Sequence, residues 1–191
     1  LSHDLEPNPA YEEACRFGAE WQRAGCRLIH LRKENKTALV IDNQSLTALK
    51  LFPIDDALCY NDVVRWMYDS LYEMNIECDV VDIHALEPSQ YKLLITPALY
   101  CASEDSIAKL RGFVHGGGTL VSSFKSFFAD EHATVYHDMQ PHNMTDCFGM
   151  HYSQFVQPSH VKLGNAECSC FAELLSADEA DVLEQYEHPY W

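Results

Sequence analysis

The 191-residue sequence lacks several features that define well-known classes of protein. It has no uninterrupted apolar stretch near the roughly 18 residues that cross a bilayer, and its start has no signal-peptide pattern. Basic residues are few, 13 against 29 acidic ones, which gives a formal net charge of −16. Because such a chain repels phosphate backbones and anionic lipid, we expect neither a nucleic-acid partner nor a membrane-surface partner.

The eight cysteines include no Cys-x-x-Cys pair, which removes support for a structural zinc site or a thioredoxin motif. Several lie in apolar runs, as Cys78 does in "IECDVV", where a reduced thiol behaves as a small hydrophobic side chain. In a chain of this length they indicate reduced, cytoplasmic thiols and not a disulfide framework. We therefore expect a cytoplasmic protein without a cofactor.

Histidine and carboxylate pairs also lack the spacing of a known site. His132, His137, His142 and His151 show neither His-x-x-x-His nor His-Glu-x-x-His, so we interpret them as loop residues and expect no metal site. The adjacent carboxylates Asp55–Asp56 and Asp130–Glu131 are ordinary in so acidic a chain. Glycoside hydrolysis needs two carboxylates facing each other across a sugar, which adjacency in sequence does not show.

The first secondary-structure element that the sequence predicts is an amphipathic helix over residues 9–24. Asn8 is a suitable N-cap, Pro9 suits the first turn, and an apolar stripe follows at helical spacing. A short charged linker, Arg32 to Lys36, comes next. We place a domain boundary there, with residues 1–35 on one side and 36–191 on the other.

After the linker, strands and helices alternate. We predict strands over 37–42, 76–83, 91–97 and 118–124, helices over 61–75 and 103–115, and a long connection over 43–60. Such alternation predicts a three-layer α/β/α fold with an open, mainly parallel sheet of flavodoxin-like order. From about residue 129 the sequence indicates loops, and 176–191 begins as an acidic amphipathic helix.

The glycine run Gly116–Gly118 does not form a phosphate-binding loop. A dinucleotide fingerprint would need a third glycine where Val121 stands, and these glycines follow a helix instead of preceding one. A Walker loop fails as well, because Phe124 precedes Lys125. We interpret the run as a helix C-cap in left-handed conformation that leads into a buried strand.

The turn after the fourth predicted strand, "SSFKSFF", is where a nucleophile elbow would lie. Its bulky phenylalanines argue against Ser123 or Ser126 as a nucleophile. Cys101 follows the third strand and precedes a helix N-terminus, which could lower its pKa. A free-standing, thiol-dependent hydrolase that uses Cys101 is therefore the alternative function. A small-molecule site in the strand-end crevice has no residue constellation in its favour.

Four segments together carry a resemblance to a known family: "NKTALVIDNQSLTALKLFP", "YNDVVRWMYDSLYEMNIECDVVD", "YKLLITPALYCAS" and "LRGFVHGGGTLVSSFKSFFADEH". The chain resembles the middle, or trimerisation, domain of glycoside hydrolase family 42 β-galactosidases over about residues 36–164. That domain has a class I glutamine amidotransferase-like fold, but the elbow here has no cysteine. Upstream, "SHDLEPNPAYEEACRFGAEW" is similar to the last helix of the family's catalytic (β/α)8 barrel. Downstream, "VLEQYEHPYW" resembles the end of the middle domain.

The resemblance implies a non-catalytic oligomerisation domain of an enzyme that hydrolyses terminal β-D-galactosyl residues. In the family, two glutamates at the ends of barrel strands hydrolyse the glycosidic bond, and the product retains the configuration of the substrate. No residue here matches them, so we assign no catalytic, cofactor or metal residue and expect this chain alone to be inactive. The expected partner is the chain itself, as a homotrimer, with the galactoside bound mainly by the barrel. The aromatic segments "RWMYDSLY" and "FKSFF" are expected in packing or contact surfaces.

Overall fold

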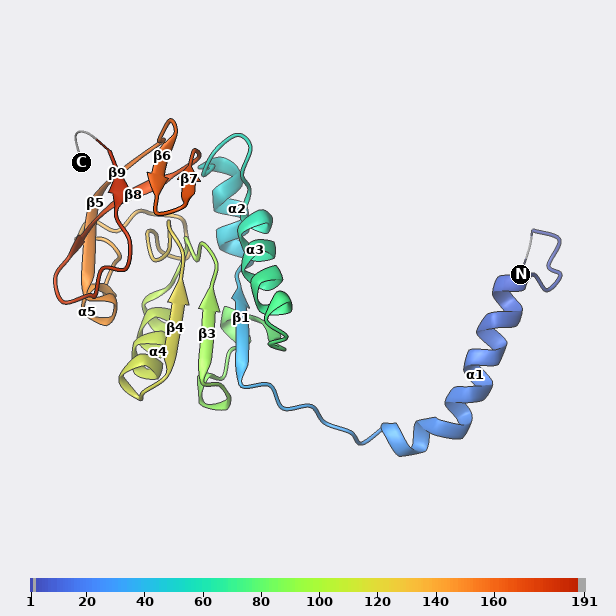
Figure 1. Cartoon of the computed structure of the whole chain (residues 1–191). Helices are drawn as coiled ribbons and strands as arrows, with labels where there is room; N and C mark the ends of the chain where they lie inside the picture. Colours follow the sequence, from blue (N-terminus) through green and yellow to red (C-terminus); the bar gives the residue numbers. More distant parts are fainter. Residues whose placement is uncertain (2, 189–191) are drawn as a thin grey trace. The chain divides into compact units, whose positions relative to one another are not determined.

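A computed structural model describes residues 1 and 3–188 of the chain, which divides into two compact units, Leu1–Glu34 and Asn35–Trp191 (Figure 1). The first unit is built on one helix, α1 (Pro9–Leu28), which runs four residues beyond the predicted end. The Asn8 side chain accepts a hydrogen bond from the Tyr11 N–H at 2.9 Å, which confirms the predicted N-cap. The apolar stripe of α1 is open to solvent, with Phe17 67% and Trp21 52% exposed.

The second unit contains a four-stranded parallel sheet in the order β2-β1-β3-β4. Its strands are β1 (Thr37–Ile41), β2 (Asp79–Asp82), β3 (Leu93–Thr96) and β4 (Thr119–Ser122). Two 3₁₀ turns, η1 (Ile83–Ala85) and η2 (Pro88–Gln90), connect β2 to β3. The order matches the start of a flavodoxin-like sheet, so the predicted fold class is confirmed.

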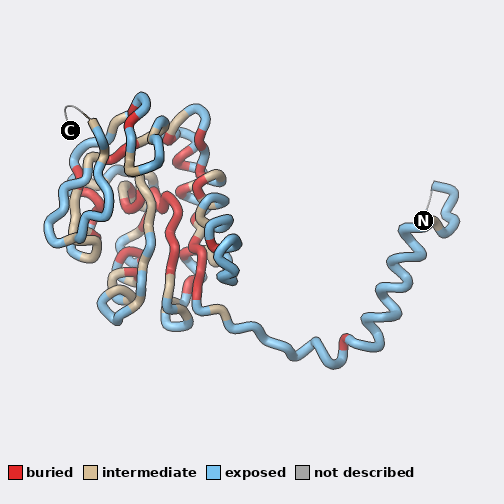
Figure 2. The backbone as a smooth tube through the Cα atoms, in the orientation of Figure 1, coloured by how far each residue is buried: buried red, intermediate tan, exposed pale blue. Residues whose placement is uncertain are grey.

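Helices cover both faces of this sheet. Ala38 and Val40 of β1 pack in one cluster with Ile107 of α4 (Glu104–His115). Leu39, which lies between them in sequence, packs instead with Leu71 of α3 (Tyr60–Glu73). Alternate residues of a strand point to opposite faces, and here both faces are apolar and covered. Figure 2 accordingly shows the buried backbone concentrated along the strands of the second unit.

The predicted long connection over 43–60 is wrong, because it contains helix α2 (Asn43–Leu51). Asp42 caps this helix, and its carboxylate accepts the Ser45 N–H at 2.5 Å. Ala48 and Leu49 are buried against the neighbouring helix and loops. The prediction of a loop was based on Pro53, Asp55 and Asp56, and all three lie after the helix ends.

The predicted helix over 61–75 exists as α3, but its buried face differs in part from the one that helical spacing predicts, which is Val64, Met67, Tyr68, Leu71 and Met74. The residues in the core are Tyr60, Val63 and Leu71. Tyr68 and Met74, which the helical spacing placed in the core, are 43% and 60% exposed. Apolar residues surround much of this helix, so periodicity alone did not determine the buried face.

Helix α4 begins and ends as expected. The Ser103 hydroxyl accepts the Ser106 N–H at 3.3 Å, and the glycine run ends the helix. Gly117 has the left-handed backbone, with φ of +90°. A Cβ on Gly118 would lie 2.3 Å from the Phe113 ring, so any larger residue there would have to displace this ring. The glycines therefore have a structural role: they end α4 before β4 begins.

The region after residue 129 is not simply loops, as predicted. It contains α5 (Thr145–Phe148), β5 (Met150–Val156), β6 (Val161–Leu163), β7 (Ala166–Cys168), β8 (Ala172–Ala177) and β9 (Tyr186–Glu187). β5 pairs with β8 and β6 with both β7 and β9, all antiparallel. The helix expected from 176 does not form within the described residues, and the aromatic end at 189–191 lies outside them. The pairings of β5 with β8 and of β6 with β9 join distant segments and leave little local signal, whereas β6 and β7 form a short hairpin.

Among the described residues, no helix has both the length and the apolar character needed to cross a membrane.

Candidate functional site

The carboxyl end of β4 runs into a strained turn, residues 123–128. Lys125 and Phe127 both have positive φ, 55° and 60°, although neither is a glycine. The Ser123 hydroxyl accepts the Ala98 N–H at 2.7 Å, and the Ser126 hydroxyl accepts the Leu99 N–H at 3.1 Å. Both serines therefore bind the turn to the segment that follows β3.

Lys125 lies where a nucleophile elbow would present its reactive side chain. Its ammonium is 5.3 Å from the centroid of the Phe171 ring, 5.7 Å from that of Phe155 and 5.9 Å from that of Tyr100. It also donates to the Pro53 carbonyl at 3.1 Å. Burial lowers the pKa of this ammonium below its usual value. The cation–π contacts and the carbonyl fasten the turn to its neighbours.

Glu173 of β8 is a carboxyl group held inside the fold at this turn. It is 7% exposed, and its Oε1 accepts the Lys125 N–H at 2.7 Å. Burial raises the pKa of Glu173 to about 7, because desolvation disfavours the charged form. Tyr152 lies beside it, 3% exposed, and its hydroxyl interacts with the Glu173 carboxyl. Burial, and then the Glu173 charge, raises the pKa of Tyr152.

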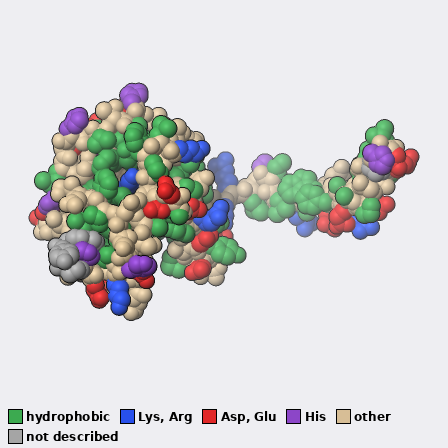
Figure 3. All heavy atoms as spheres, turned by 90° about the horizontal axis from the view of Figure 1, so that it is seen from above, with side chains coloured by type: hydrophobic (Ala, Val, Ile, Leu, Met, Phe, Trp, Pro, Cys, Tyr) green, Lys and Arg blue, Asp and Glu red, His purple; other side chains and the backbone are tan. Residues whose placement is uncertain are grey.

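These side chains line a pocket with a volume of about 140 Å³, which we call the strand-end pocket. Its polar groups are the Ser122, Ser123 and Ser126 hydroxyls, the Tyr152 hydroxyl and the Glu173 carboxyl, and its apolar walls are Phe124, Phe127, Pro141, Phe148, Met150 and Leu175. Figure 3 looks onto this end of the sheet and shows hydrophobic side chains gathered there. Open α/β sheets bind ligands at this edge.

Cys101 does not have the reactive thiol that the alternative function needs. It is 2% exposed, and burial, followed by the Asp42 charge, raises the pKa of its thiol to about 12. The Ser45 hydroxyl accepts the Cys101 N–H at 2.9 Å and fixes the backbone there. Desolvation outweighs any effect of the nearby helix N-terminus, so a thiol-dependent hydrolase that uses Cys101 is not supported.

Two of the four histidines expected in loops, His142 and His151, differ from that prediction in burial or in position. His151 lies in β5, and its Nδ1 is 2.8 Å from Asp178 Oδ2. His142 does lie in a turn but is only 8% exposed, with Nδ1 2.7 Å from Asp138 Oδ1 and Nε2 2.8 Å from Glu104 Oε1. These two bind carboxylates, while His132 and His137 are exposed.

The adjacent carboxylates shape turns. Asp55 accepts the Ala57 N–H at 2.8 Å, and Asp130 accepts the His132 and Thr134 N–H groups at 2.9 and 2.8 Å. Each of these two side chains therefore caps its own local backbone.

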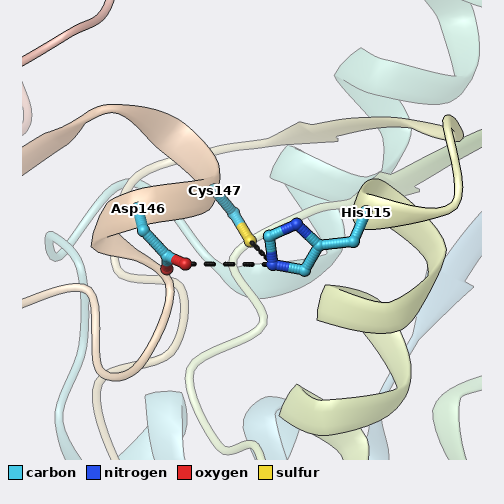
Figure 4. Close-up of side chains that lie close together, drawn as sticks. All are labelled: His115, Asp146 and Cys147. Atoms are coloured by element: carbon cyan, nitrogen blue, oxygen red, sulfur yellow. Dashed lines mark hydrogen bonds and ion pairs between the residues drawn. The ribbon is translucent and has the colours of Figure 1, made fainter.

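Sequence reasoning missed one cluster, His115, Asp146 and Cys147, whose ligand atoms all lie within 4.8 Å of one another. The residues come from the end of α4 and from α5 and point toward one another (Figure 4). Asp146 Oδ2 and Cys147 Sγ approach the same His115 nitrogen, Nε2, at 3.8 and 3.9 Å, so the three do not form a proton relay. Arg111 binds both carboxylate oxygens of Asp146. The carboxylate is thus already neutralised, which disfavours a cation.

Four large apolar side chains in and just after α3 are exposed, namely Trp66, Tyr68, Tyr72 and Met74. Their exposed fractions are 54%, 43%, 73% and 60%. The other aromatic segment differs, because Phe127 is fully buried and Phe124 and Phe128 pack against a buried cluster. Of the two aromatic segments noted in the sequence, "RWMYDSLY" therefore reaches the surface and "FKSFF" belongs mostly to the interior.

Comparison with known proteins identifies the family. Residues 35–191 match the sequence profile of the β-galactosidase trimerisation domain. The chain belongs to this trimerisation-domain family. It is 28% identical over 194 residues to β-galactosidase BgaB of Geobacillus sp., with 97% of this chain and 29% of that protein covered. It is 30% identical over 144 residues to β-galactosidase GanA of Bacillus subtilis, with 71% of this chain and 20% of that protein covered. The resemblance to family 42 is confirmed.

Solved structures agree with this assignment. The β-galactosidase of Bacillus circulans sp. alkalophilus superposes with a TM-score of 0.85 at 27% identity, over 97% of this chain and 29% of that one. α-L-fucosidase isoenzyme 2 of Paenibacillus thiaminolyticus shares the fold alone, with a TM-score of 0.59 at 18% identity, over 91% of this chain and 26% of that one. The chain thus spans about 29% of the length of the first relatives it matches.

Proposed function

We propose that this chain is the non-catalytic trimerisation domain of a β-galactosidase, with the two catalytic glutamates outside the chain. The observation that carries the proposal is the family match over residues 35–191, together with β-galactosidase relatives of which the chain covers about 29%. The parent enzyme would hydrolyse terminal β-D-galactosyl residues with retention of configuration. Galactoside would then bind mainly in the barrel.

Residues 1–35 would be the tail of that catalytic barrel, and residues 36–191 the amidotransferase-like domain. The exposed apolar stripe of α1, with Phe17 and Trp21 half or more open to solvent, supports this division. An amphipathic helix normally covers such a stripe against other elements. The helices of a (β/α)8 barrel bury it on the strands.

The partner of this domain would be two further copies of the same chain, forming a homotrimer through the exposed aromatic residues of α3. Trp66 and Tyr72 are the residue types that are enriched at the centres of protein interfaces, and both are more than half exposed here. The charge of −16 argues against nucleic acid or anionic membrane as a partner. Eight free cysteines favour a cytoplasmic location. We assign no metal, cofactor or catalytic residue to this chain.

Activity of the purified chain tests the catalytic part of the proposal. We expect no hydrolysis of a chromogenic β-galactoside above the buffer rate, with the full-length enzyme as the positive control. Turnover by the 191-residue chain would overturn the proposal. Added Zn²⁺ should leave both the activity and the melting temperature unchanged, because Arg111 already binds the Asp146 carboxylate.

The mass of the full-length enzyme in solution tests the α3 surface. We expect the double variant Trp66→Ser, Tyr72→Ser to lose the trimer in sedimentation experiments. The control is Leu183→Ser, which alters another strongly exposed apolar residue, 91% exposed and distant in sequence from α3. An unchanged trimer in the double variant would exclude this face as the interface.

A further inference from the structure

A buried histidine in the connection between β4 and α5 lies between two carboxylates. Nδ1 of His142 is 2.7 and 2.8 Å from the two Asp138 oxygens, and Nε2 is 2.8 Å from Oε1 of Glu104, the first residue of α4. An ionised carboxylate only accepts hydrogen bonds, so both ring nitrogens carry a proton when they donate to these groups. The geometry is therefore that of an imidazolium that links its own turn to α4.

The ring stacked on His142 stays neutral, and the acids near it are negative. The Tyr136 ring is almost parallel to the imidazole, with centroids 3.5 Å apart. Burial, followed by the Glu104 charge, raises the pKa of Tyr136 to about 12, and the Asp130 and Glu131 charges act in the same direction. A cation over an aromatic face is favoured. Both features favour an imidazolium over a neutral imidazole.

Asn143 is a second partner for the same ring nitrogen. Its Nδ2 is 3.2 Å from Glu104 Oε2 and 3.2 Å from His142 Nε2. While Nε2 carries a proton, this amide can donate to Glu104 but not to Nε2. Once that proton leaves, Nε2 becomes an acceptor, and the amide can donate to it instead. Arg111 of α4 binds the Asn143 carbonyl, and this contact does not involve the imidazole.

We propose that His142 forms a proton-dependent link: as an imidazolium it joins the turn of residues 138–143 to Glu104, and as a neutral ring it releases Glu104 and accepts from Asn143. The imidazolium donates a charge-assisted hydrogen bond to Glu104, whereas a neutral Nε2 would present a lone pair to the same oxygen, 2.8 Å away. Nδ1 keeps its proton, because both Asp138 oxygens lie beside it.

The link joins α4 to the turn that follows β4. The His142 N–H donates to the Phe127 carbonyl at 3.1 Å, and the Gln140 carbonyl accepts the Tyr152 N–H at 2.9 Å. Because the charged ring makes the link, the link is present at low pH and is lost as the pH rises through the titration of the ring. The proposal concerns the fold of this chain and does not depend on trimerisation.

An NMR titration of the full 191-residue chain tests the proposal by following the His142 ring nitrogens and the protection factors of the His142 and Met144 amides. We expect a loss of protection of roughly threefold as the ring loses its proton, the scale of a partly exposed ion pair. The neutral ring should carry its proton on Nδ1. Unchanged protection, or a neutral ring protonated on Nε2, would overturn the proposal.

The same titration in Glu173→Gln removes the other buried group that titrates near neutral pH, since the pKa of Glu173 is raised to about 7. The loss of protection should persist in this background. Its disappearance would assign the effect to Glu173 and overturn the proposal.

Two further variants separate the link from general effects of charge. Glu104→Gln places an amide opposite Nε2 that can accept from it or donate to it, so protection should change by less than about 1.5-fold across the titration of the ring. The matched control, Glu131→Gln, removes the same charge from an exposed acid near Tyr136 and should keep the full change. A change in Glu104→Gln as large as in the wild type would contradict Glu104 as the partner.

Discussion

The parallel sheet and the layer beyond its carboxyl end are stabilised by different means. In the sheet, β1 and β3 contribute buried residues that are mostly apolar, such as Leu39 and Leu94, at 1% and 0% exposed. The layer beyond it, residues 123–188, buries Glu173, and beside Glu173 lies the partly buried ammonium of Lys125. Five non-glycine residues of this layer have a positive φ, among them Lys125 and Phe127. We call this second region the strand-end layer.

The comparison shows which region of the protein has a stability that depends on pH. Apolar burial contributes free energy that does not depend on protonation. A buried carboxyl group gives the strand-end layer a stability that depends on pH. The same layer holds the strand-end pocket and the positive-φ turn of Lys125 and Phe127.

The largest effect should come from the sheet. Leu94→Ala removes a fully buried side chain between the sheet and helix α4 and should lower the free energy of unfolding by about 3 kcal/mol. Urea denaturation at pH 5 and pH 8 should give the same loss at both. Leu183→Ala, at a site 91% exposed, is the control and should change little. A loss that differs strongly with pH would break the contrast between the regions.

Glu173→Gln tests the strand-end layer. Burial raises the pKa of Glu173 from 4.5 to about 7, so the protonated form stabilises the fold. That stability is fully present below pH 4.5 and is lost as the pH rises through about 7. The variant should therefore exceed the wild type at pH 8 by about 2 kcal/mol and match it near pH 4.5. Denaturant curves across this range measure the difference. Parallel pH profiles would show that Glu173 is not desolvated.

Ser126→Ala probes the link between the two regions. Without its hydroxyl, the Leu99 N–H loses the acceptor now 3.1 Å away in a buried position. We expect a loss of about 1–2 kcal/mol in the free energy of unfolding, as for other unsatisfied buried donors. Ser153→Ala, at an exposed position of β5, should stay within about 0.5 kcal/mol of the wild type. Equal effects would mean that solvent reaches the Leu99 amide.

The smallest effect should come from the α4–α5 ion pair. Arg111 holds the pKa of Asp146 below its usual value, but the Asp146 side chain is 53% exposed. Asp146→Asn should therefore cost less than about 1 kcal/mol, and less still at high salt. Thermal unfolding at two salt concentrations measures both. A loss as large as that of Leu94→Ala would require a buried role for this pair.

Several elements could be predicted because their signals are local. Asn8 and Ser103 cap the helices that they precede, and the glycine run ends α4. The missed helix α2 lies beside a proline and two aspartates that suggested a loop. Helix α3 was predicted with the right period, but apolar residues surround much of it, so the period did not determine which of them are buried. Two of the three pairings after residue 149, β5 with β8 and β6 with β9, join segments about 20 or more residues apart. The third, β6 with β7, is a short hairpin that sequence reasoning missed although its signal is local.

The sequence by itself determined the fold class, the family and the absence of a cysteine at the elbow. Each rests on short windows: alternating buried strands, capped helices and family-specific motifs. Only the tertiary structure decided the depth of Cys101, the exposed face of α3 and the strand-end pocket. Burial and pKa depend on what surrounds a side chain in space. Glu173 acquires its raised pKa only because β8 places it beneath the turn that follows β4.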